Sequence, residues 1–381
     1  MHNTTYLHAA GAMRPYRMLY KCFSCVALAL VVVSCGSLPP SRRANTIADD
    51  ILQPIRYSLV FIIHGDGGYL YHDSLGNAHI ADQEALAGAI RVAGQNQQAE
   101  VLIFHQKTRK HVLFLFPRHD GTFYYYRNGE KLAEESYWRD QKQFRFEPEV
   151  ELYNRYHTAG FPSAGKILLY FGHEISEFGI SRYDASSPGR VFIIDDLANG
   201  LKQMTGDASK FDLIVLSTCF NGTPHTVSAL APYARYIIAS PENLHRSYMD
   251  LSSFERLEAG LSDGNMAGFA KNYAQLSFNR LAEELQTTVA IAVYDVERVR
   301  GYLDSVDSTY KKALTGLAGM KRRFFEHQDC AEDSAYVRQG MREGVDVFYR
   351  SPRFGRFKNK TNHSGWGCWK QPTEKDHDIE R

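Results

Sequence analysis

Two side chains in this chain of 381 residues have the types and the placement for nucleophilic catalysis, His173 and Cys219. His173 follows the apolar run Lys166–Phe171 after one glycine, and Cys219 follows the apolar run Phe211–Leu216 after two residues. A thiol attacks as its thiolate, and an imidazole that titrates near neutral pH is a base that can take its proton. Both runs are typical of buried strands, and the carboxyl ends of neighbouring parallel strands meet at one edge of a sheet. We therefore predict that His173 and Cys219 lie at the same edge.

The other cysteines leave Cys219 as the residue for which a chemical role is sought. The chain has six, of which Cys22, Cys25 and Cys35 lie near the N-terminus and Cys330 and Cys368 near the C-terminus. The last two could pair in an oxidising compartment. No C-x-x-C pair follows residue 35, so a zinc ribbon is not supported.

Apolar runs alternate with amphipathic stretches between residues 56 and 316, which predicts an α/β domain. Its mainly parallel sheet has six predicted strands and helices on both faces. The predicted strands are 56–63, 101–104, 166–171, 211–216, 236–239 and 288–293. The predicted helices are 82–93, 150–157, 196–204, 223–233, 266–285 and 297–316. Residues 112–116 and 122–126 are expected to form a small hairpin insertion.

Three segments around the candidate pair resemble the clostripain family of caspase-like cysteine peptidases. They are Gly165–His173, Phe211–Gly222 and Ala234–Glu242. In that family one strand ends in a catalytic His, the next in Asp-Ala-Cys-Leu-Met-Gly and the following one in Ala-Ser-Glu-Glu. Ile63–Leu70 and Thr287–Asp295 are similar to two further family segments in the same order. The resemblance implies a caspase-like endopeptidase in which His173 is the general base and Cys219 forms an acyl-enzyme.

Three positions depart from the family pattern. Glu174 stands where the family has a Gly that helps to form the oxyanion hole. Because Glu174 also has a backbone N–H, the resemblance implies an oxyanion hole formed by the backbone N–H groups of Glu174 and Cys219. His225 stands where the family has Glu. Ser217 stands where the family has the Asp that lines a pocket for basic side chains. A catalytically inactive protein that keeps the fold as a binding module is therefore the alternative.

The expected substrate pocket includes Ser217, Ser240 and Glu242. A neutral Ser217 hydroxyl cannot supply the charge-assisted hydrogen bond that a substrate Arg or Lys would receive from Asp. We therefore predict cleavage of peptides or proteins without a strong Arg/Lys requirement. Glu242 is the acid that would compensate if its side chain turned into the pocket.

The N-terminal residues predict secretion and lipid anchoring. Arg14, Arg17 and Lys21 precede a short apolar run, which ends in Val32-Val33-Ser34-Cys35. This stretch resembles a bacterial lipobox, whose Cys is lipidated. We expect a signal peptide over 1–34 and a lipidated Cys35 with a tether over 35–55.

The peptidase domain is expected over 56–318 and a C-terminal extension with a basic tail over 319–381. The expected location is the bacterial cell envelope, on the outer membrane if the host has one.

Other functions are less well supported by the sequence. Lys and Arg total 44 against 43 for Asp and Glu, so no overall field favours nucleic acid. A zinc-protease motif would need His where Glu177 stands, and Leu216–Gly222 lacks the first glycine of a hydrolase nucleophile elbow. We expect no cofactor. Asp184 and Asp195 are interpreted as helix caps in preference to calcium ligands, and Asp66 as a turn residue. Residues 350–360 carry five basic side chains and are interpreted as a solvated tail in preference to a contact for anionic lipid.

Overall fold

The computed structural model describes residues 54–65, 70–72, 76–108, 110–112, 116–139, 146–158, 165–177, 191–206, 209–244, 249–261, 264–317 and 326–370. All structural statements below concern these residues. The predicted signal peptide, Cys35 and its tether, Asp66 and Asp184 lie outside them.

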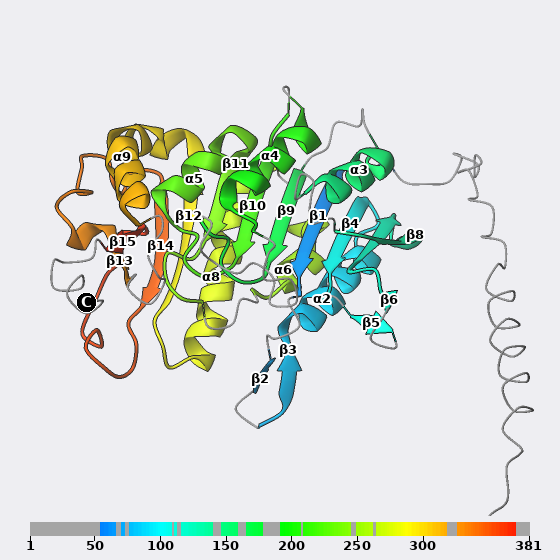
Figure 1. Ribbon diagram of the computed structural model, residues 1–381, viewed down its shortest axis with the longest axis horizontal. Coiled ribbons are helices and arrows are strands. Elements are labelled where there is room, and N and C mark those ends of the chain that lie inside the picture. The colour runs from blue at the N-terminus through cyan, green and yellow to red at the C-terminus, as the bar shows by residue number, and fades with distance from the viewer. Residues whose placement is uncertain are drawn as a thin grey trace, which may run out of the picture. The chain divides into compact units, whose positions relative to one another are not determined.

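The centre of the fold is a nine-stranded sheet with the order β14-β12-β11-β10-β9-β1-β4-β7-β8 (Figure 1). The five strands from β11 to β4 are mutually parallel, and an antiparallel pair extends each side. The strands are β1 Tyr57–His64, β4 Ala99–Gln106, β7 Gly121–Arg127, β8 Glu130–Tyr137, β9 Gly165–Phe171, β10 Phe211–Ser217, β11 Ala234–Ala239, β12 Val289–Asp295 and β14 Val345–Arg350. Three short pairs lie outside this sheet: β2 Leu70–His72 with β3 Ala78–Ile80, β5 His111–Val112 with β6 Phe116–Pro117, and β13 Glu326–Asp329 with β15 Gly367–Lys370. The α/β class with a mainly parallel sheet was predicted and is confirmed.

Helices cover both faces of the sheet, which is why the middle of each central strand is apolar (Figure 1). Alternate residues of β9 serve opposite faces: Leu168 packs into one hydrophobic cluster and Leu169 into the other. The first cluster includes side chains of α3 Glu147–Tyr156, α4 Ile194–Thr205, α5 Pro224–Leu230 and α9 Val296–Leu317. The second includes side chains of α2 Ala81–Gln95, α6 Ser252–Glu255, α7 Leu257–Gly260 and α8 Met266–Glu284. Two short 3-10 helices, Ala231–Tyr233 and Cys330–Glu332, complete the described elements. None of the described helices combines the length and the apolar character that crossing a membrane would require.

The predicted hairpin insertion was wrong in its pairing. The strand Gly121–Arg127 pairs with Glu130–Tyr137 and with β4, rather than with residues 112–116. Asn128 and Gly129 join the two strands with φ angles of +53° and +83°. Positive φ at both central residues is the requirement of the type I′ turn that favours Asn-Gly. The second strand was missed because it is a charged edge strand, EKLAEESY, without an apolar run.

The sheet has nine strands where six were expected, and one of the additional strands comes from the C-terminal extension. β14 pairs antiparallel with β12, so the extension is part of the sheet. Both ends of the basic segment are bound internally. The Arg350 guanidinium donates to the carbonyls of Leu285 and Thr287, and Lys360 Nζ lies 3.0 Å from an Asp329 carboxylate oxygen. The prediction of a solvated tail therefore fails for these two residues, because their charges are used to attach the segment.

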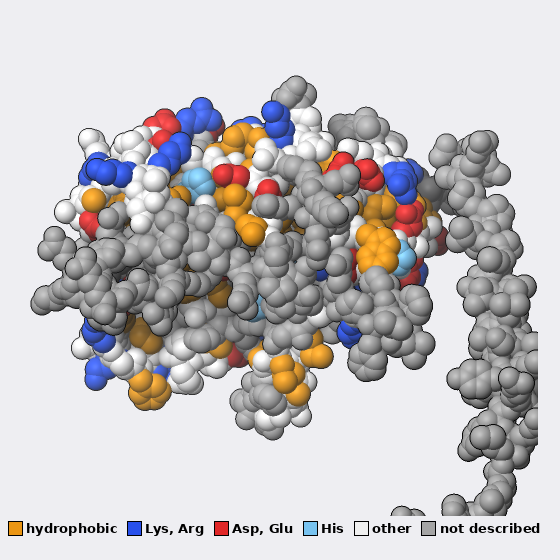
Figure 2. Space-filling model, in the orientation of Figure 1, with side chains coloured by type: hydrophobic (Ala, Val, Ile, Leu, Met, Phe, Trp, Pro, Cys, Tyr) orange, Lys and Arg blue, Asp and Glu red, His pale blue; other side chains and the backbone are white. Residues whose placement is uncertain are grey.

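Charged side chains of both signs are interspersed on the face shown in Figure 2, over the helices that cover the first cluster.

Two of the cysteines are joined: Cys330 and Cys368 form a disulfide with a Cα–Cα distance of 5.1 Å. This pairing is the one that the sequence left open.

Candidate active site

The strands that carry His173 and Cys219 are direct neighbours. β9 and β10 run parallel, and their register pairs Phe171 with Ser217. The Gly172 N–H donates to the Ser217 carbonyl at 3.4 Å, so the alignment continues past the end of β9. His173 and Cys219 each follow this pair by two residues, and both are half-buried. The prediction that His173 and Cys219 lie at the same edge required their strands to be neighbours, and they are.

Cys219 has defined contacts in the loop that follows β11. Its Sγ lies 3.2 Å from Asn243 Oδ1 and 3.5 Å from the Leu244 carbonyl oxygen, both as acceptors. Both oxygens are therefore placed to accept a hydrogen bond from the thiol. Among the described residues it is the only cysteine outside a disulfide.

A sharp turn follows the thiol. Phe220 has φ of +54°, a left-handed conformation that is rare for a bulky side chain and costs roughly 1–3 kcal/mol. The surroundings stabilise this conformation: the Phe220 N–H donates to the Glu242 carbonyl at 3.1 Å, and the Gly222 N–H donates to the Ser240 carbonyl at 2.8 Å. A Cβ at Gly222 would lie 2.6 Å from Pro241 N, so only glycine permits this approach. The backbone of the Cys219 loop is therefore held in place by hydrogen bonds to the loop that follows β11.

Asn221 joins the two candidate loops and was not singled out from the sequence. Its Nδ2 donates to the Ile175 carbonyl at 2.8 Å, and its Oδ1 accepts from the Ile175 N–H at 3.0 Å. Oδ1 also accepts from the Thr218 hydroxyl at 2.7 Å. Asn221 is fully buried, and it connects the loop after His173 to the loop of Cys219. A signal was available: a polar Asn stands where the resembling family motif has Met.

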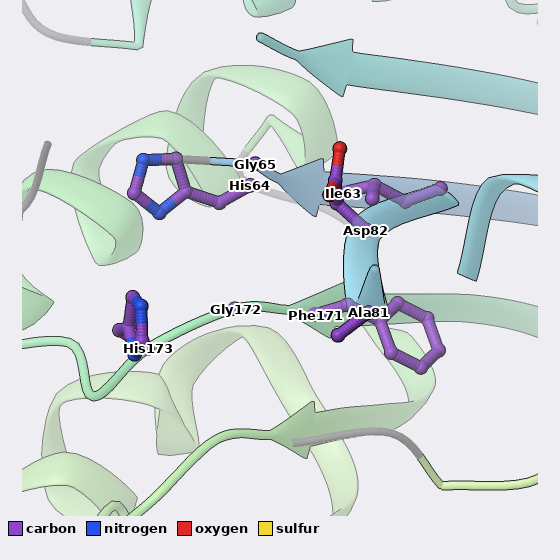
Figure 3. Close-up of a pocket in the computed structure, with 8 residues that line it drawn as sticks. All are labelled: Ile63, His64, Gly65, Ala81, Asp82, Phe171, Gly172 and His173. Carbon is purple, nitrogen blue, oxygen red and sulfur yellow. The ribbon is translucent and has the colours of Figure 1, made fainter. Parts of the chain in front are cut away.

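A small pocket lies beside His173, on the side away from β10 (Figure 3). His64 ends β1, and its ring and that of His173 project from neighbouring strand ends toward the same space, whereas Asp82 lies at the other side of the pocket. His105 Nε2 is 2.9 Å from an Asp82 carboxylate oxygen. Burial by itself would raise the pKa of Asp82, but the hydrogen bond and charge of His105 outweigh it and hold this pKa below its usual range. Cys219 does not line this pocket.

The predicted pocket residues have the following positions. Ser217 is fully buried, and its hydroxyl accepts from the Met249 N–H at 2.9 Å. Ser240 is also fully buried, and its hydroxyl donates to the Glu242 carbonyl at 2.8 Å. The Glu242 carboxylate lies 3.3 Å from Nε2 of the buried His363. Glu174 follows His173 in the loop after β9 and is half-buried. The participation of these residues in substrate binding stays a prediction.

The described residues contain no group of three or more His, Cys, Asp or Glu side chains arranged to hold a metal ion. Asp195 lies in the first turn of α4, where its Oδ1 is 3.7 Å from His225 Nε2. The capping bond of that helix comes from the next residue, because Asp196 accepts from the Ile193 N–H at 3.0 Å.

Comparison with known proteins adds the family. The model of the clostripain family matches residues 174–346 of this chain. This segment is similar to the clostripain family. The matched segment contains Cys219, β10, β11 and β12, and it begins one residue after His173. It ends at Asp346, so His363 and β15 lie outside it.

Two solved structures are similar to this chain. An inactive zymogen C11 protease from Parabacteroides distasonis has a TM-score of 0.53 and 14% identity, over 87% of this chain and 96% of that chain. A secreted C11 cysteine protease from Bacteroides thetaiotaomicron, in complex with an irreversible peptide inhibitor, has a TM-score of 0.49 and 13% identity, over 83% of this chain and 90% of that chain. Among curated proteins no significant match was found. At such identity the first structure supports the fold alone.

Proposed function

We propose that this protein is a lipid-anchored cysteine endopeptidase, with Cys219 as nucleophile and His173 as general base. The proposal rests mainly on the equivalent positions of His173 and Cys219 at the ends of their strands. Each lies two positions beyond a residue pair, Phe171 and Ser217, that is aligned across neighbouring parallel strands. Similarity to the clostripain family supports peptide or protein substrates.

The reaction follows from these two side chains. The His173 imidazole accepts the Cys219 thiol proton, and the thiolate attacks the carbonyl carbon of the scissile peptide bond. The oxygen of the tetrahedral intermediate accepts hydrogen bonds from the backbone N–H groups of Glu174 and Cys219. The C–N bond breaks, the amine leaves with the proton held by His173, and a thioester remains on Cys219. Water then attacks the thioester while His173 removes its proton, and return of this proton to sulfur restores the thiol.

A digestion of a peptide library with wild type, Cys219→Ala and His173→Ala tests the pair. We expect both variants to lose cleavage, and Cys219→Ala to lose labelling by a thiol-directed fluorescent probe. Loss of His173 should slow labelling, because less thiolate forms at neutral pH. The matched control is His119→Ala, since His119 stacks on Trp138 and adjoins β7, three strands along the sheet from β9. A folded wild type that neither cleaves the library nor labels at Cys219 would favour the inactive binding module.

The proposed peptidase does not depend on Arg or Lys before the scissile bond. Ser217 carries no charge, and its hydroxyl is engaged with the Met249 N–H. The Glu242 carboxylate lies 3.3 Å from His363 Nε2, so it already has a partner within the protein. The measurement is kcat/KM across a fluorogenic panel that varies only this residue. A preference of about a hundredfold or more for Arg or Lys, on the order of 3 kcal/mol, would contradict the proposal and indicate Glu242 as the acid.

Anchoring and envelope location form the remaining part of the proposal. The Val-Val-Ser-Cys35 stretch is its basis, and the Cys330–Cys368 disulfide supports it because disulfides persist in oxidising compartments outside the cytosol. We expect Cys35→Ser to move the protein from the membrane fraction to the soluble fraction. Unchanged membrane association of this variant would count against lipidation of Cys35.

A further inference from the structure

The hairpin of β13 and β15 contacts both loops of the proposed active site, although it comes from the far end of the chain. β13 is Glu326–Asp329 and β15 is Gly367–Lys370, paired antiparallel and joined by the Cys330–Cys368 disulfide. We propose that this hairpin is a positioning element of the active site, and that formation of its disulfide makes the peptidase competent. This inference rests on the proposed function.

The hairpin lies directly against the Cys219 loop. The Gly367 N–H donates to the Gly222 carbonyl at 2.8 Å, three residues after the thiol. A Cβ at Gly367 would lie 2.6 Å from the Pro241 carbonyl oxygen, so the hairpin backbone also touches the loop after β11. The rings of His327 and Phe220 are 4.8 Å apart, which places a hairpin side chain against the strained residue that follows Cys219.

The hairpin also reaches the loop that follows His173. Trp369 Nε1 donates to the Glu177 carboxylate at 2.9 Å, across 192 positions of sequence. Glu177 is buried and lies four residues after His173. A buried carboxylate requires donors for both oxygens, and a donor that is lost leaves a costly unsatisfied charge. The orientation of this loop therefore depends on the donors that surround Glu177.

Glu177 collects donors from several elements. The Tyr310 hydroxyl of α9 donates at 3.1 Å, and the Thr226 hydroxyl of α5 donates at 3.0 Å. Thr223, which caps α5, also donates to it. Trp369 is the donor that comes from the disulfide-linked hairpin. Because α5 begins directly after the Cys219 loop, Glu177 connects the loops of base and nucleophile through the same carboxylate.

The hairpin is held where it can perform this role. The Cys330 N–H donates to the Trp366 carbonyl at 2.9 Å, and Asp329 accepts from the Ser364 N–H at 3.1 Å. Trp366 is fully buried, and its Nε1 donates to the Met341 carbonyl at 2.7 Å. The disulfide links the end of β13 to the residue next to Trp369. Without this bond, the position of Trp369 rests on short strand pairing and on non-covalent contacts such as that of Gly367 with Gly222.

The oxidation step is balanced by a disulfide-bearing oxidant of the secretory compartment. One thiolate of the pair attacks the oxidant, and the second thiolate attacks the resulting mixed disulfide. Cys330 and Cys368 lose two electrons and two protons in total, and the oxidant is reduced to two thiols. The chain would then be inactive while its thiols are reduced and would become active after export.

The test compares Trp369→Phe with wild type and with Trp138→Phe as the control, since Trp138 is 40% exposed and stacks on His119. Trp369→Phe keeps an aromatic ring and removes the N–H donor to Glu177 together with part of the buried ring volume. We expect kcat to fall about 10-fold to 100-fold, the loss associated with a hydrogen bond to a charged group, with KM within about twofold. We also expect the alkylation rate of Cys219 to require higher pH, because a displaced His173 assists ionisation less. Trp138→Phe should leave all three quantities unchanged.

A second variant, Cys330→Ser with Cys368→Ser, tests the disulfide with the catalytic thiol kept reduced throughout. We expect a folded protein, as judged by circular dichroism, with kcat lowered at least tenfold. A Glu177→Gln, Trp369→Phe double variant should lose less than the sum of the two single losses, because both changes remove one interaction. Wild-type kcat in both Trp369→Phe and the folded double-serine variant would overturn the inference. If wild type labels but does not cleave, the proposed function fails, and the pH dependence of Cys219 alkylation still decides the role of the hairpin.

Discussion

The strands β9 and β10 and the segment 326–370 both support the loop of Cys219, but they do so by different interactions. β9 and β10 are continuous apolar strands buried on both faces, and backbone pairing sets their register. The segment 326–370 contributes short strands, a disulfide, and polar and aromatic contacts such as that of Trp369 with Glu177. Apolar burial is strong but has little directional preference, whereas hydrogen bonds are weaker and directional.

The strands therefore mainly stabilise the fold, whereas the contacts of segment 326–370 mainly orient the loops. The central strands place His173 and Cys219 at one edge of the sheet, and the contacts beyond that edge determine how each loop is held. We therefore expect substitutions in the strands to lower mainly the free energy of unfolding. Substitutions among the loop contacts should lower mainly the activity of protein that remains folded.

The largest expected effect is on stability, from Leu169→Ala in β9. Leu169 is fully buried two residues before Phe171, so the truncation should lower the free energy of unfolding by about 2–5 kcal/mol. Urea unfolding measures this change, and kcat per folded molecule should stay within about twofold. Leu132→Ala on β8 is the matched control, because Leu132 is 49% exposed and should change stability by less than about 0.5 kcal/mol. A selective loss of kcat in folded Leu169→Ala would contradict the separation.

The next effect is on activity, from Asn221→Met, which introduces the residue of the resembling family motif. The change leaves the Ile175 N–H and carbonyl without their side-chain partner, so the His173 loop should shift relative to Cys219. We expect kcat/KM to fall roughly 10-fold to 100-fold, or about 1.4–2.8 kcal/mol in transition-state stabilisation. Asn272→Leu, at an exposed position of α8, is the control. Unchanged kcat/KM would show that the strands alone orient the loops.

A smaller effect should appear in pH dependence when Asn243 is replaced. Asn243→Asp puts a negative charge near the Cys219 sulfur, which disfavours the thiolate and raises its pKa. The acid limb of the kcat/KM profile should move to higher pH by about one unit, or about 1.4 kcal/mol. Asn243→Leu removes an acceptor of the neutral thiol and should move the limb in the opposite direction. Equal profiles for the two variants would refute a contact between Asn243 and the reacting thiol.

The smallest effect concerns acid stability of the C-terminal segment, through Asp329. Burial alone would raise the pKa of Asp329, but the charge of His363 and the hydrogen bond of Ser364 outweigh it and lower this pKa. A folded-state pKa below the unfolded value means that the carboxylate stabilises the fold at pH values above the unfolded pKa. This contribution is lost as pH falls through the folded pKa. Asp329→Asn should lower stability at pH 7 by roughly 1 kcal/mol and flatten the decline in acid. Urea unfolding at neutral pH and near pH 3 measures both, and parallel acid declines for the two proteins would count against this role.

The sequence was sufficient for the central strands and for predicting that His173 and Cys219 follow strands that end at one edge of the sheet. Runs such as Lys166–Phe171 and Phe211–Leu216 carry local signals, because a strand buried on both faces must be apolar throughout. Placement of His173 and Cys219 follows from these runs by the direction of parallel strands. The Asn128-Gly129 turn carried an equally local signal, and the hairpin was mispredicted because that signal was not used.

The contacts that hold the two loops were decided only by the tertiary structure. Asn221 meets Ile175 across 46 positions, and Trp369 meets Glu177 across 192. Such pairs leave no periodic pattern, because each depends on a single side chain and on the path of the backbone between distant elements. The sequence left open whether Cys330 and Cys368 form a disulfide, and the pairing of β13 with β15 brings them together. The sequence by itself therefore determined which residues stand at the edge of the sheet, and the tertiary structure decided what surrounds them.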